Sequence, residues 1–91
     1  AGREFTRAAG TAVCLLEGRA VAVLERQGEA LRLLEPACAD EALAALARDF
    51  AAHRIFPHLD RLCIRAYPEG VASALARAGF ARLMLDYVLY P

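Results

Sequence analysis

The chain has 91 residues, enough for one domain with a single core, near the lower end of the usual size range. Eleven basic residues, all of them Arg, balance eleven Asp and Glu residues. The resulting net charge of zero excludes a global electrostatic attraction to nucleic acid or to membrane surfaces, so any electrostatic binding must come from local clusters of charge.

The first half of the chain predicts an antiparallel meander of three strands, after an N-terminal lead-in over residues 1–10. The expected strands cover residues 11–16, 19–26 and 30–34. Gly18 and Gly28 stand at the second position of the two intervening turns. Glycine at this position is typical of a tight hairpin because it adopts a positive φ without steric cost.

Two-residue turns would set the register of the meander and its two faces. Leu15 would pair with Ala20, Val13 with Ala22, Ala22 with Leu33, and Leu24 with Leu31. One face would then be wholly apolar: Val13, Leu15, Ala20, Ala22, Leu24, Leu31 and Leu33. The other, mixed face would carry Cys14, Leu16, Arg19, Val21, Val23, Glu25 and Arg32. A slip of one residue would exchange the faces, and the apolar face is expected to take the helices.

The second half alternates helices and strands. Helices are expected from Asp40, as N-cap, to about Arg54 and over residues 71–78, with strands over 62–67 and 82–90. Gly79 is expected to end the second helix in the left-handed conformation, with Phe80 folding back toward Leu75. The order β-β-β-α-β-α-β predicts an α+β domain over residues 11–91, in which two helices pack on one face of the meander and the further strands.

The predicted core collects the large apolar residues of these patterns. It comprises Val13, Leu15, Leu24, Leu31, Leu33, Leu43, Leu46, Phe50, Leu62, Ile64, Leu75, Phe80, Leu83 and Leu85.

Few residues suggest catalysis or a bound cofactor. His53 and His58 lie five residues apart across Pro57, and no Cys or carboxylate stands at zinc spacing around them. Ser73 is the only serine, and none of the standard phosphate-binding glycine motifs occurs. We therefore expect no catalytic, cofactor-binding or metal-binding residue, and no cofactor, in this chain.

The cysteines and the hydropathy pattern bear on the location of the protein. Cys14, Cys38 and Cys63 are odd in number and form no zinc motif, which favours a reducing cytoplasm. No apolar run approaches the length of a membrane span, so we expect no membrane partner.

The mixed face provides a candidate surface for nucleic acid or a protein partner, formed by Arg19, Val21, Val23 and Arg32. Its arginines could contact phosphates, but Glu25 dilutes their charge and no aromatic residues alternate with them to stack on bases. A protein-covered face is favoured, the cover being another domain of a larger parent protein or a second copy in a homodimer. Nucleic acid is expected to bind weakly at most.

The run VCLLEGRAVAVLERQGEALRLLE, followed by RLCIRAYP and VASALARAGF, resembles the C-terminal region of the large helicase-related superfamily-2 ATPases, which are DEAD/DEAH-box helicases. The matching residues are Gly18, Val21, Val23, Leu24, Glu25, Arg26, Gly28, Leu31, Leu75, Ala78, Gly79 and Phe80. The resemblance implies a non-catalytic accessory domain of an ATP-dependent nucleic-acid helicase. Such a domain would help to position nucleic acid or brace the motor, and ATP would bind elsewhere in the parent protein.

A weaker resemblance, in the order of elements and the A-x-x-G-F helix end, is to the later part of the acetyl-coenzyme A N-acyltransferases. That family binds pyrophosphate with a glycine-containing loop, whereas residues 35–40 here read EPACAD. The resemblance implies an acetyltransferase-like domain that has lost or lacks the coenzyme A loop. A dimerising interaction module is a third interpretation.

Overall fold

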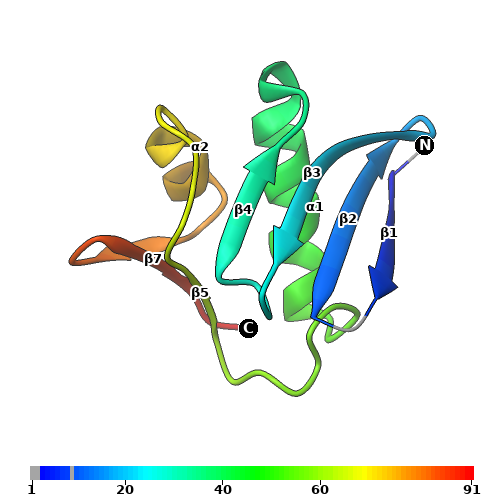
Figure 1. Cartoon of the computed structure of the whole chain (residues 1–91). Helices are drawn as coiled ribbons and strands as arrows, with labels where there is room; N and C mark the ends of the chain where they lie inside the picture. Colours follow the sequence, from blue (N-terminus) through cyan, green and yellow to red (C-terminus); the bar gives the residue numbers. More distant parts are fainter. Residues whose placement is uncertain (1–2, 9) are drawn as a thin grey trace.

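A computed structural model describes residues 3–8 and 10–91, with side chains from residue 10 onward. The first sheet contains four antiparallel strands in chain order: β1 (Arg3–Ala8), β2 (Thr11–Leu16), β3 (Arg19–Glu25) and β4 (Ala30–Leu33) (Figure 1). Strand β1 lies within the expected lead-in and pairs with β2 along its whole length. The meander is therefore one strand wider than the sequence pattern indicated.

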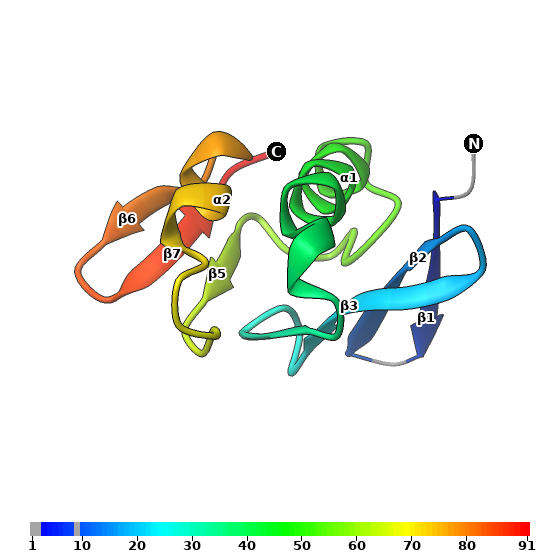
Figure 2. The same ribbon diagram turned by 90° about the horizontal axis from the view of Figure 1, so that it is seen from above.

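The second half forms a separate, three-stranded antiparallel sheet and the helices. After the 3-10 turn η1 (Pro36–Cys38) come α1 (Ala39–Ala51), β5 (Leu62–Ile64), α2 (Ala72–Arg77), β6 (Ala81–Leu83) and β7 (Asp86–Leu89). The strand order is β5-β7-β6. Two antiparallel sheets and two helices confirm the α+β class. Helix α1 covers one face of the first sheet, whereas no described helix covers the other (Figure 2). No helix of residues 3–8 and 10–91 has the length and apolar character that a membrane crossing requires.

A β-bulge corrects the predicted faces of β2 and β3. The pairs Leu15–Ala20, Ala22–Leu33 and Leu24–Leu31 are confirmed, but Ala22 pairs with Cys14, not with Val13. Because β3 has one extra residue at this point, Val21 and Ala22 both turn toward the helix, as expected of a bulge. Val21 is 1% exposed, so its assignment to the mixed face is wrong.

The bulge also exchanges the inward and outward faces that were predicted for β2. Ala12 and Cys14 point toward the core, whereas the core positions predicted for Val13 and Leu15 are wrong, because both residues lie half-buried on the opposite face. Small side chains of α1, Ala42 and Ala45, pack against Cys14 and its buried neighbours on β3. This helix–sheet contact is therefore made largely by small residues.

Helix α1 starts and ends earlier than predicted. Pro36 begins η1, which leads directly into the helix, so Cys38 is the N-cap and Asp40 lies in the first turn. At the other end His53 has a φ of +60°, its N–H bonds to the carbonyl of Phe50, and the N–H of Arg54 bonds to that of Asp49. This bonding pattern is a Schellman cap, which ends the helix before Arg54.

The predicted last strand is two strands joined by a tight turn. Leu83 pairs with Asp86, so Met84 and Leu85 form a two-residue hairpin loop. Leu83 is 58% exposed and Leu85 is 71% exposed, and their predicted core positions are therefore wrong. The hairpin carries both side chains beyond the reach of the core. The preceding helix end follows the prediction: Gly79 has a φ of +102°, and the N–H of Phe80 bonds to the carbonyl of Leu75.

One hydrophobic cluster joins the two sheets. It contains Leu24 and Leu31 from the first sheet, Phe50 from α1, and Leu62 and Ile64 from the second sheet. Buried residues between the regular elements, Ile55, Phe56 and Val71, complete it. Among the described residues, the backbone bonds between the two halves lie around Ala30 and Ala66, which form a parallel bridge. Nine of the predicted core residues are buried: Leu24, Leu31, Leu43, Leu46, Phe50, Leu62, Ile64, Leu75 and Phe80.

Candidate functional site

Each of the two arginines predicted for the mixed face is paired with a glutamate. Arg19 Nη1 lies 2.5 Å from Glu35 Oε1, and Arg32 Nη1 lies 3.4 Å from Glu25 Oε1. All four side chains are between about a third and two thirds exposed, so each pair contributes little to stability. The local partner carboxylates nevertheless offset the positive charge that a phosphate would meet.

The uncovered face of the first sheet, the open sheet face, is formed by Val13, Leu15, Val23, Glu25 and Arg32. Val23 stands directly opposite Val13 on one side and Arg32 on the other. The structure therefore brings together two of the predicted site residues, Val23 and Arg32. Arg19 lies at the far end of β3, and Val21 is under α1. The outward side chains of β2, Val13 and Leu15, are thus larger than its inward side chains Ala12 and Cys14, whereas the inward side chains of β3 include Val21 and Leu24.

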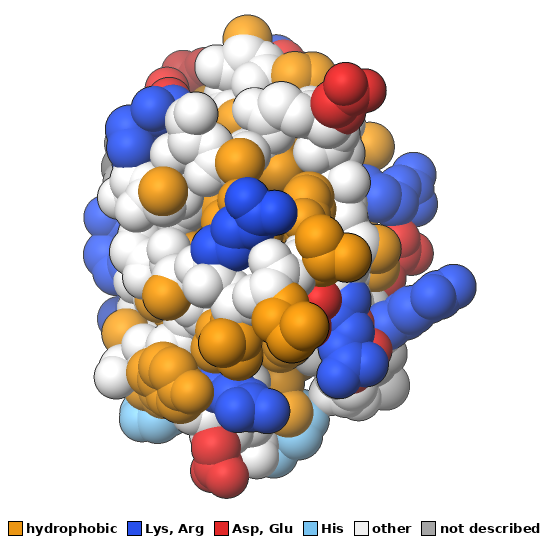
Figure 3. Space-filling model, turned by 90° about the vertical axis from the view of Figure 1, so that its left-hand side faces the viewer, with side chains coloured by type: hydrophobic (Ala, Val, Ile, Leu, Met, Phe, Trp, Pro, Cys, Tyr) orange, Lys and Arg blue, Asp and Glu red, His pale blue; other side chains and the backbone are white. Residues whose placement is uncertain are grey.

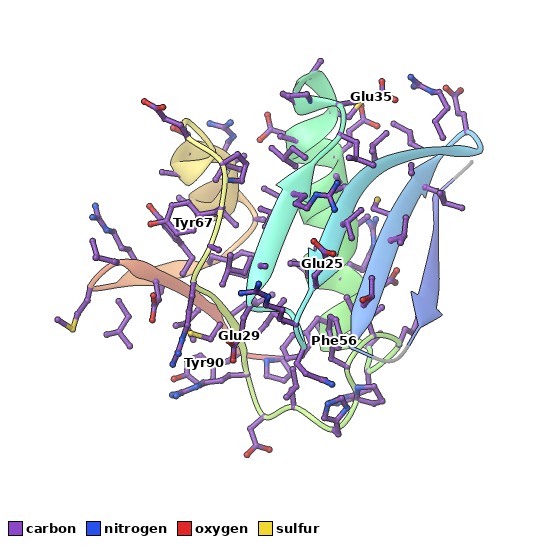
Figure 4. All side chains as sticks on the ribbon, viewed as in Figure 1. Glu25, Glu29, Glu35, Phe56, Tyr67 and Tyr90 are labelled. Carbon is purple, nitrogen blue, oxygen red and sulfur yellow. The ribbon has the colours of Figure 1, made fainter. Side chains whose placement is uncertain are left out.

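A cleft of about 650 Å³ separates β4 from the chain that follows β5. We call it the inter-sheet cleft. Its lining residues are Glu25, Arg26, Ala30, Leu31, Arg32, Leu33, Leu34, Ala66, Tyr67 and Pro68. Glu25 and Tyr67 come from its two sides (Figure 4). Tyr67 is held by a 2.6 Å hydrogen bond from its hydroxyl to the carbonyl of Leu85, and its ring packs edge-on against Tyr87.

The cleft begins where the backbone pairing between the sheets stops. The N–H of Ala66 bonds to the carbonyl of Glu29, and the N–H of Leu31 bonds to the carbonyl of Ala66. A parallel ladder would continue with a bond from residue 68 to the carbonyl of Leu31. Residue 68 is proline, which has no N–H to donate, and the chain turns away from β4 at this point (Figure 1).

The β6–β7 hairpin tip is the most exposed apolar segment among the described residues. Leu83, Met84 and Leu85 are 58%, 87% and 71% exposed. Met84 has a φ of +58°, a conformation unfavourable for a residue with a Cβ, and Arg82 Nε donates to its carbonyl. Orange side chains gather among blue arginines on the face of the molecule that the hairpin occupies (Figure 3).

Two further titratable residues, His58 and Cys63, each contact one polar side chain. His58 Nε2 lies 2.7 Å from Gln27 Oε1, and Cys63 Sγ lies 3.8 Å from Asp86 Oδ2. The Cys63 side chain first, and then the carboxylates of Glu29 and Asp86, raise the pKa of the exposed Arg65 guanidinium above its usual value. Among residues with described side chains, no three His, Cys, Asp or Glu side chains are grouped to hold a metal ion.

Comparison with models of protein families finds no match, and searches of curated proteins and of solved structures find no significant match.

Sequence reasoning missed both the inter-sheet cleft and the hairpin tip. Pro68 was a sequence signal for the cleft. A proline directly after a strand ends the strand and cannot donate the next hydrogen bond to a neighbouring strand. The tip carried none, because Met84-Leu85 lacks the Gly, Asn or Asp that marks most two-residue hairpin turns.

Proposed function

We propose that this chain is a non-catalytic accessory domain of an ATP-dependent nucleic-acid helicase, which braces the motor by packing its open sheet face against another domain of the parent protein. The observation that carries the bracing role is the apolar character of the open sheet face. Val13, Leu15 and Val23 lie half-buried on this face, which no described helix covers (Figure 2). An apolar surface of this kind is typical of an interaction site.

The paired arginines favour bracing over nucleic-acid positioning. A phosphate approaching Arg19 or Arg32 would meet Glu35 or Glu25 within 2.5 to 3.4 Å of the guanidinium. Such pairs would have to rearrange before phosphate contacts form. We therefore expect the domain to contribute little of the nucleic-acid affinity of its parent.

The hairpin tip supports the same role. Exposed apolar side chains at Leu83, Met84 and Leu85 provide a second contact of the type used between domains. A cytoplasmic location belongs to the same proposal, in keeping with the odd number of cysteines.

Oligonucleotide binding tests the choice between bracing and nucleic-acid positioning. Fluorescently labelled single- and double-stranded DNA and RNA are titrated with the chain at about 50 and about 200 mM salt. We expect binding weaker than about micromolar at the higher salt, as for nonspecific contacts. Tight binding that falls steeply with salt, and is lost in the variant Arg19→Ala plus Arg32→Ala, would show that the surface contacts phosphates.

The variant Leu15→Thr plus Val23→Thr tests the open sheet face itself. Threonine preserves β propensity while removing apolar surface. We expect the isolated chain to self-associate at high concentration through this face, and the variant should abolish that self-association, measured by sedimentation. In the full-length protein it should reduce nucleic-acid-stimulated ATP hydrolysis while leaving oligonucleotide affinity unchanged. A full-length protein without nucleic-acid-dependent ATP hydrolysis would contradict the helicase assignment.

An acetyltransferase-like domain is the second candidate, favoured by the cleft at the point where the two sheets separate. Two acids oppose a pyrophosphate near the start of α1: Glu35, already paired with Arg19, and Asp40, paired with Arg77 at 2.8 Å. We expect acetyl-coenzyme A, ATP and zinc to leave the melting temperature unchanged, because a tight ligand of the folded state must raise it. A rise of several degrees with acetyl-coenzyme A alone would reverse the ranking.

A further inference from the structure

We propose that the inter-sheet cleft binds an extended polypeptide segment, which adds to β4 as a further strand and places an acidic side chain near Arg26 and Arg32. Strand β4 has two edges, one of which pairs with β3. Its antiparallel pairing with β3 includes the bond from Leu34 N–H to the carbonyl of Val21. In such a ladder alternate residues point their N–H and C=O groups to opposite sides.

The alternation turns the polar backbone groups of Leu31 and Leu33 away from β3 and toward the cleft. Leu31 N–H is bonded to Ala66, but no bond joins the Leu31 carbonyl or the Leu33 N–H and carbonyl to residues 66–68. Pro68 accounts for the unbonded Leu31 carbonyl, because it has no N–H to donate, and Leu33 is unbonded because the chain turns away from β4 at this point (Figure 1). The cleft wall therefore presents one donor and two acceptors at the spacing of a β-strand.

Strand addition is the mode of recognition that this arrangement fits. An extended peptide satisfies unpaired strand edges through its own main chain, and alternate side chains select the sequence. The walls of the cleft include Leu33, Tyr67 and Pro68 as apolar surfaces. Its volume of about 650 Å³ lies within the range of ligand-binding clefts.

The charges of the lining residues select an acidic segment. Arg26 and Arg32 line the cleft, and Glu25 is the single acid among the lining residues. Glu25 is paired with Arg32, whereas Arg26 forms no ion pair with any described side chain. The guanidinium of Arg26 is thus available to a carboxylate of the incoming strand. Because Leu15 and Val23 lie outside the cleft, this proposal and the docking of the open sheet face can fail separately.

The test uses a blocked hexapeptide, acetyl-Thr-Val-Glu-Val-Thr-Val-amide, and its Glu→Lys analogue, titrated into the isotope-labelled chain. We expect the Leu33 amide resonance to move and its hydrogen exchange to slow in the presence of the acidic peptide, with weaker binding of the analogue. The lack of any change at Leu33 up to about 1 mM peptide, a concentration at which even weak strand addition is detectable, would overturn the proposal.

Matched variants isolate the backbone contact. Leu33→Pro removes the N–H that faces the cleft and keeps the pairing with β3, whereas Leu33→Ala shortens the side chain and keeps the N–H. We expect Leu33→Pro to bind the peptide about tenfold more weakly than Leu33→Ala, as for one lost main-chain hydrogen bond. Equal affinities would count against strand addition.

N-methylated peptides provide the same test without altering the protein. Methyl groups at alternate residues should abolish binding where the amide faces β4 and be tolerated between these positions. A pattern without this alternation would exclude strand pairing. Protection of Leu33 by coenzyme A but not by the peptide would assign the cleft to an acyl carrier and overturn the proposal.

Discussion

Gly28 lies buried in the β3–β4 loop, where three consecutive residues, Arg26, Gln27 and Gly28, have positive φ values of 56°, 59° and 85°. A Cβ at Gly28 would lie 2.3 Å from Cδ1 of Leu62 and 3.6 Å from Cε2 of Phe56. Leu62 is itself fully buried, so its methyl group has little freedom to move aside. The close approach of this loop to the second sheet therefore depends on glycine.

We predict that Gly28→Ala lowers the free energy of unfolding by about 2–4 kcal/mol, through left-handed strain and overpacking against Leu62. Gly18→Ala is the matched control, because Gly18 has a φ of +80° with nothing within 4 Å of its virtual Cβ. It should lower the same quantity by only about 1 kcal/mol. Urea melts of both variants measure the difference, and equal losses would show that Leu62 yields to the methyl group.

Backbone conformation was easiest to predict at glycines that stand at turns and helix ends. Gly18 and Gly79 have the positive φ that their positions indicated. His53 and Met84 adopt the same region without any sequence signal, because tertiary structure holds a non-glycine residue there. This is why the end of α1 and the turn of the last hairpin were misplaced.

At the scale of the element, the bulge in β3 decides which side chains meet the helix. It leaves the pairing of β3 with β4 in the expected register and shifts the pairing with β2 by one residue. Val21 thereby joins Cys14 under α1, in one cluster with Ala42 and Ala45 of the helix. Two neighbouring valines on the same strand, Val21 and Val23, consequently lie in different environments.

We predict that Val21→Thr lowers the free energy of unfolding by about 1–3 kcal/mol, because the hydroxyl is buried at an apolar contact. Val23→Thr should change it by no more than about 0.5 kcal/mol, as expected for a half-exposed strand position. Thermal or urea unfolding distinguishes the two. Equal, small losses for the two variants would support the unbulged register, which places both valines on the same face.

The register illustrates what alternation can predict. Apolar residues occur at every position from 12 to 16 of β2, so either face could be the buried one, and side-chain size suggested the larger set. The structure buries the smaller set, since the alanines of α1 allow it to lie close to the sheet. Helix packing, rather than the strand pattern, settled the choice.

At the scale of the whole molecule, the two sheets share one core and few backbone bonds. Leu31 of the first sheet and Leu62, Ile64 and Tyr87 of the second belong to a single buried cluster. All three tyrosines lie in the second half, between residues 67 and 90. Their fluorescence therefore reports on the second sheet, whereas circular dichroism reports on both.

We predict that tyrosine fluorescence and far-ultraviolet circular dichroism give coincident urea transitions, because a shared core makes unfolding cooperative. Ile64→Ala should move both transitions together and lower the free energy of unfolding by about 2–5 kcal/mol, through lost burial and a cavity. Leu85→Ala, at an exposed position, should lower it by about 0.5 kcal/mol at most. Separated transitions would show that the sheets unfold independently.

The candidate surfaces depend on this global arrangement, which explains how little of them could be predicted. Arg32 and Val23 were placed correctly on one face because they are direct neighbours across two adjacent strands. The inter-sheet cleft lies between β4 and the segment of Tyr67 and Pro68, more than thirty residues away along the chain. Pro68 indicates where strand pairing ends, but no local pattern indicates that this segment lies beside β4.

The small residues between α1 and the first sheet also have a thermal consequence. The part of the interface where Ala22, Ala42 and Ala45 meet buries less apolar area per residue than leucines would bury there. The heat-capacity increment of unfolding scales with that area, at about 12–15 cal/mol/K per residue in average domains. A smaller increment flattens the curve of stability against temperature, so this domain should lose less of its stability on cooling than a leucine-rich domain of the same length.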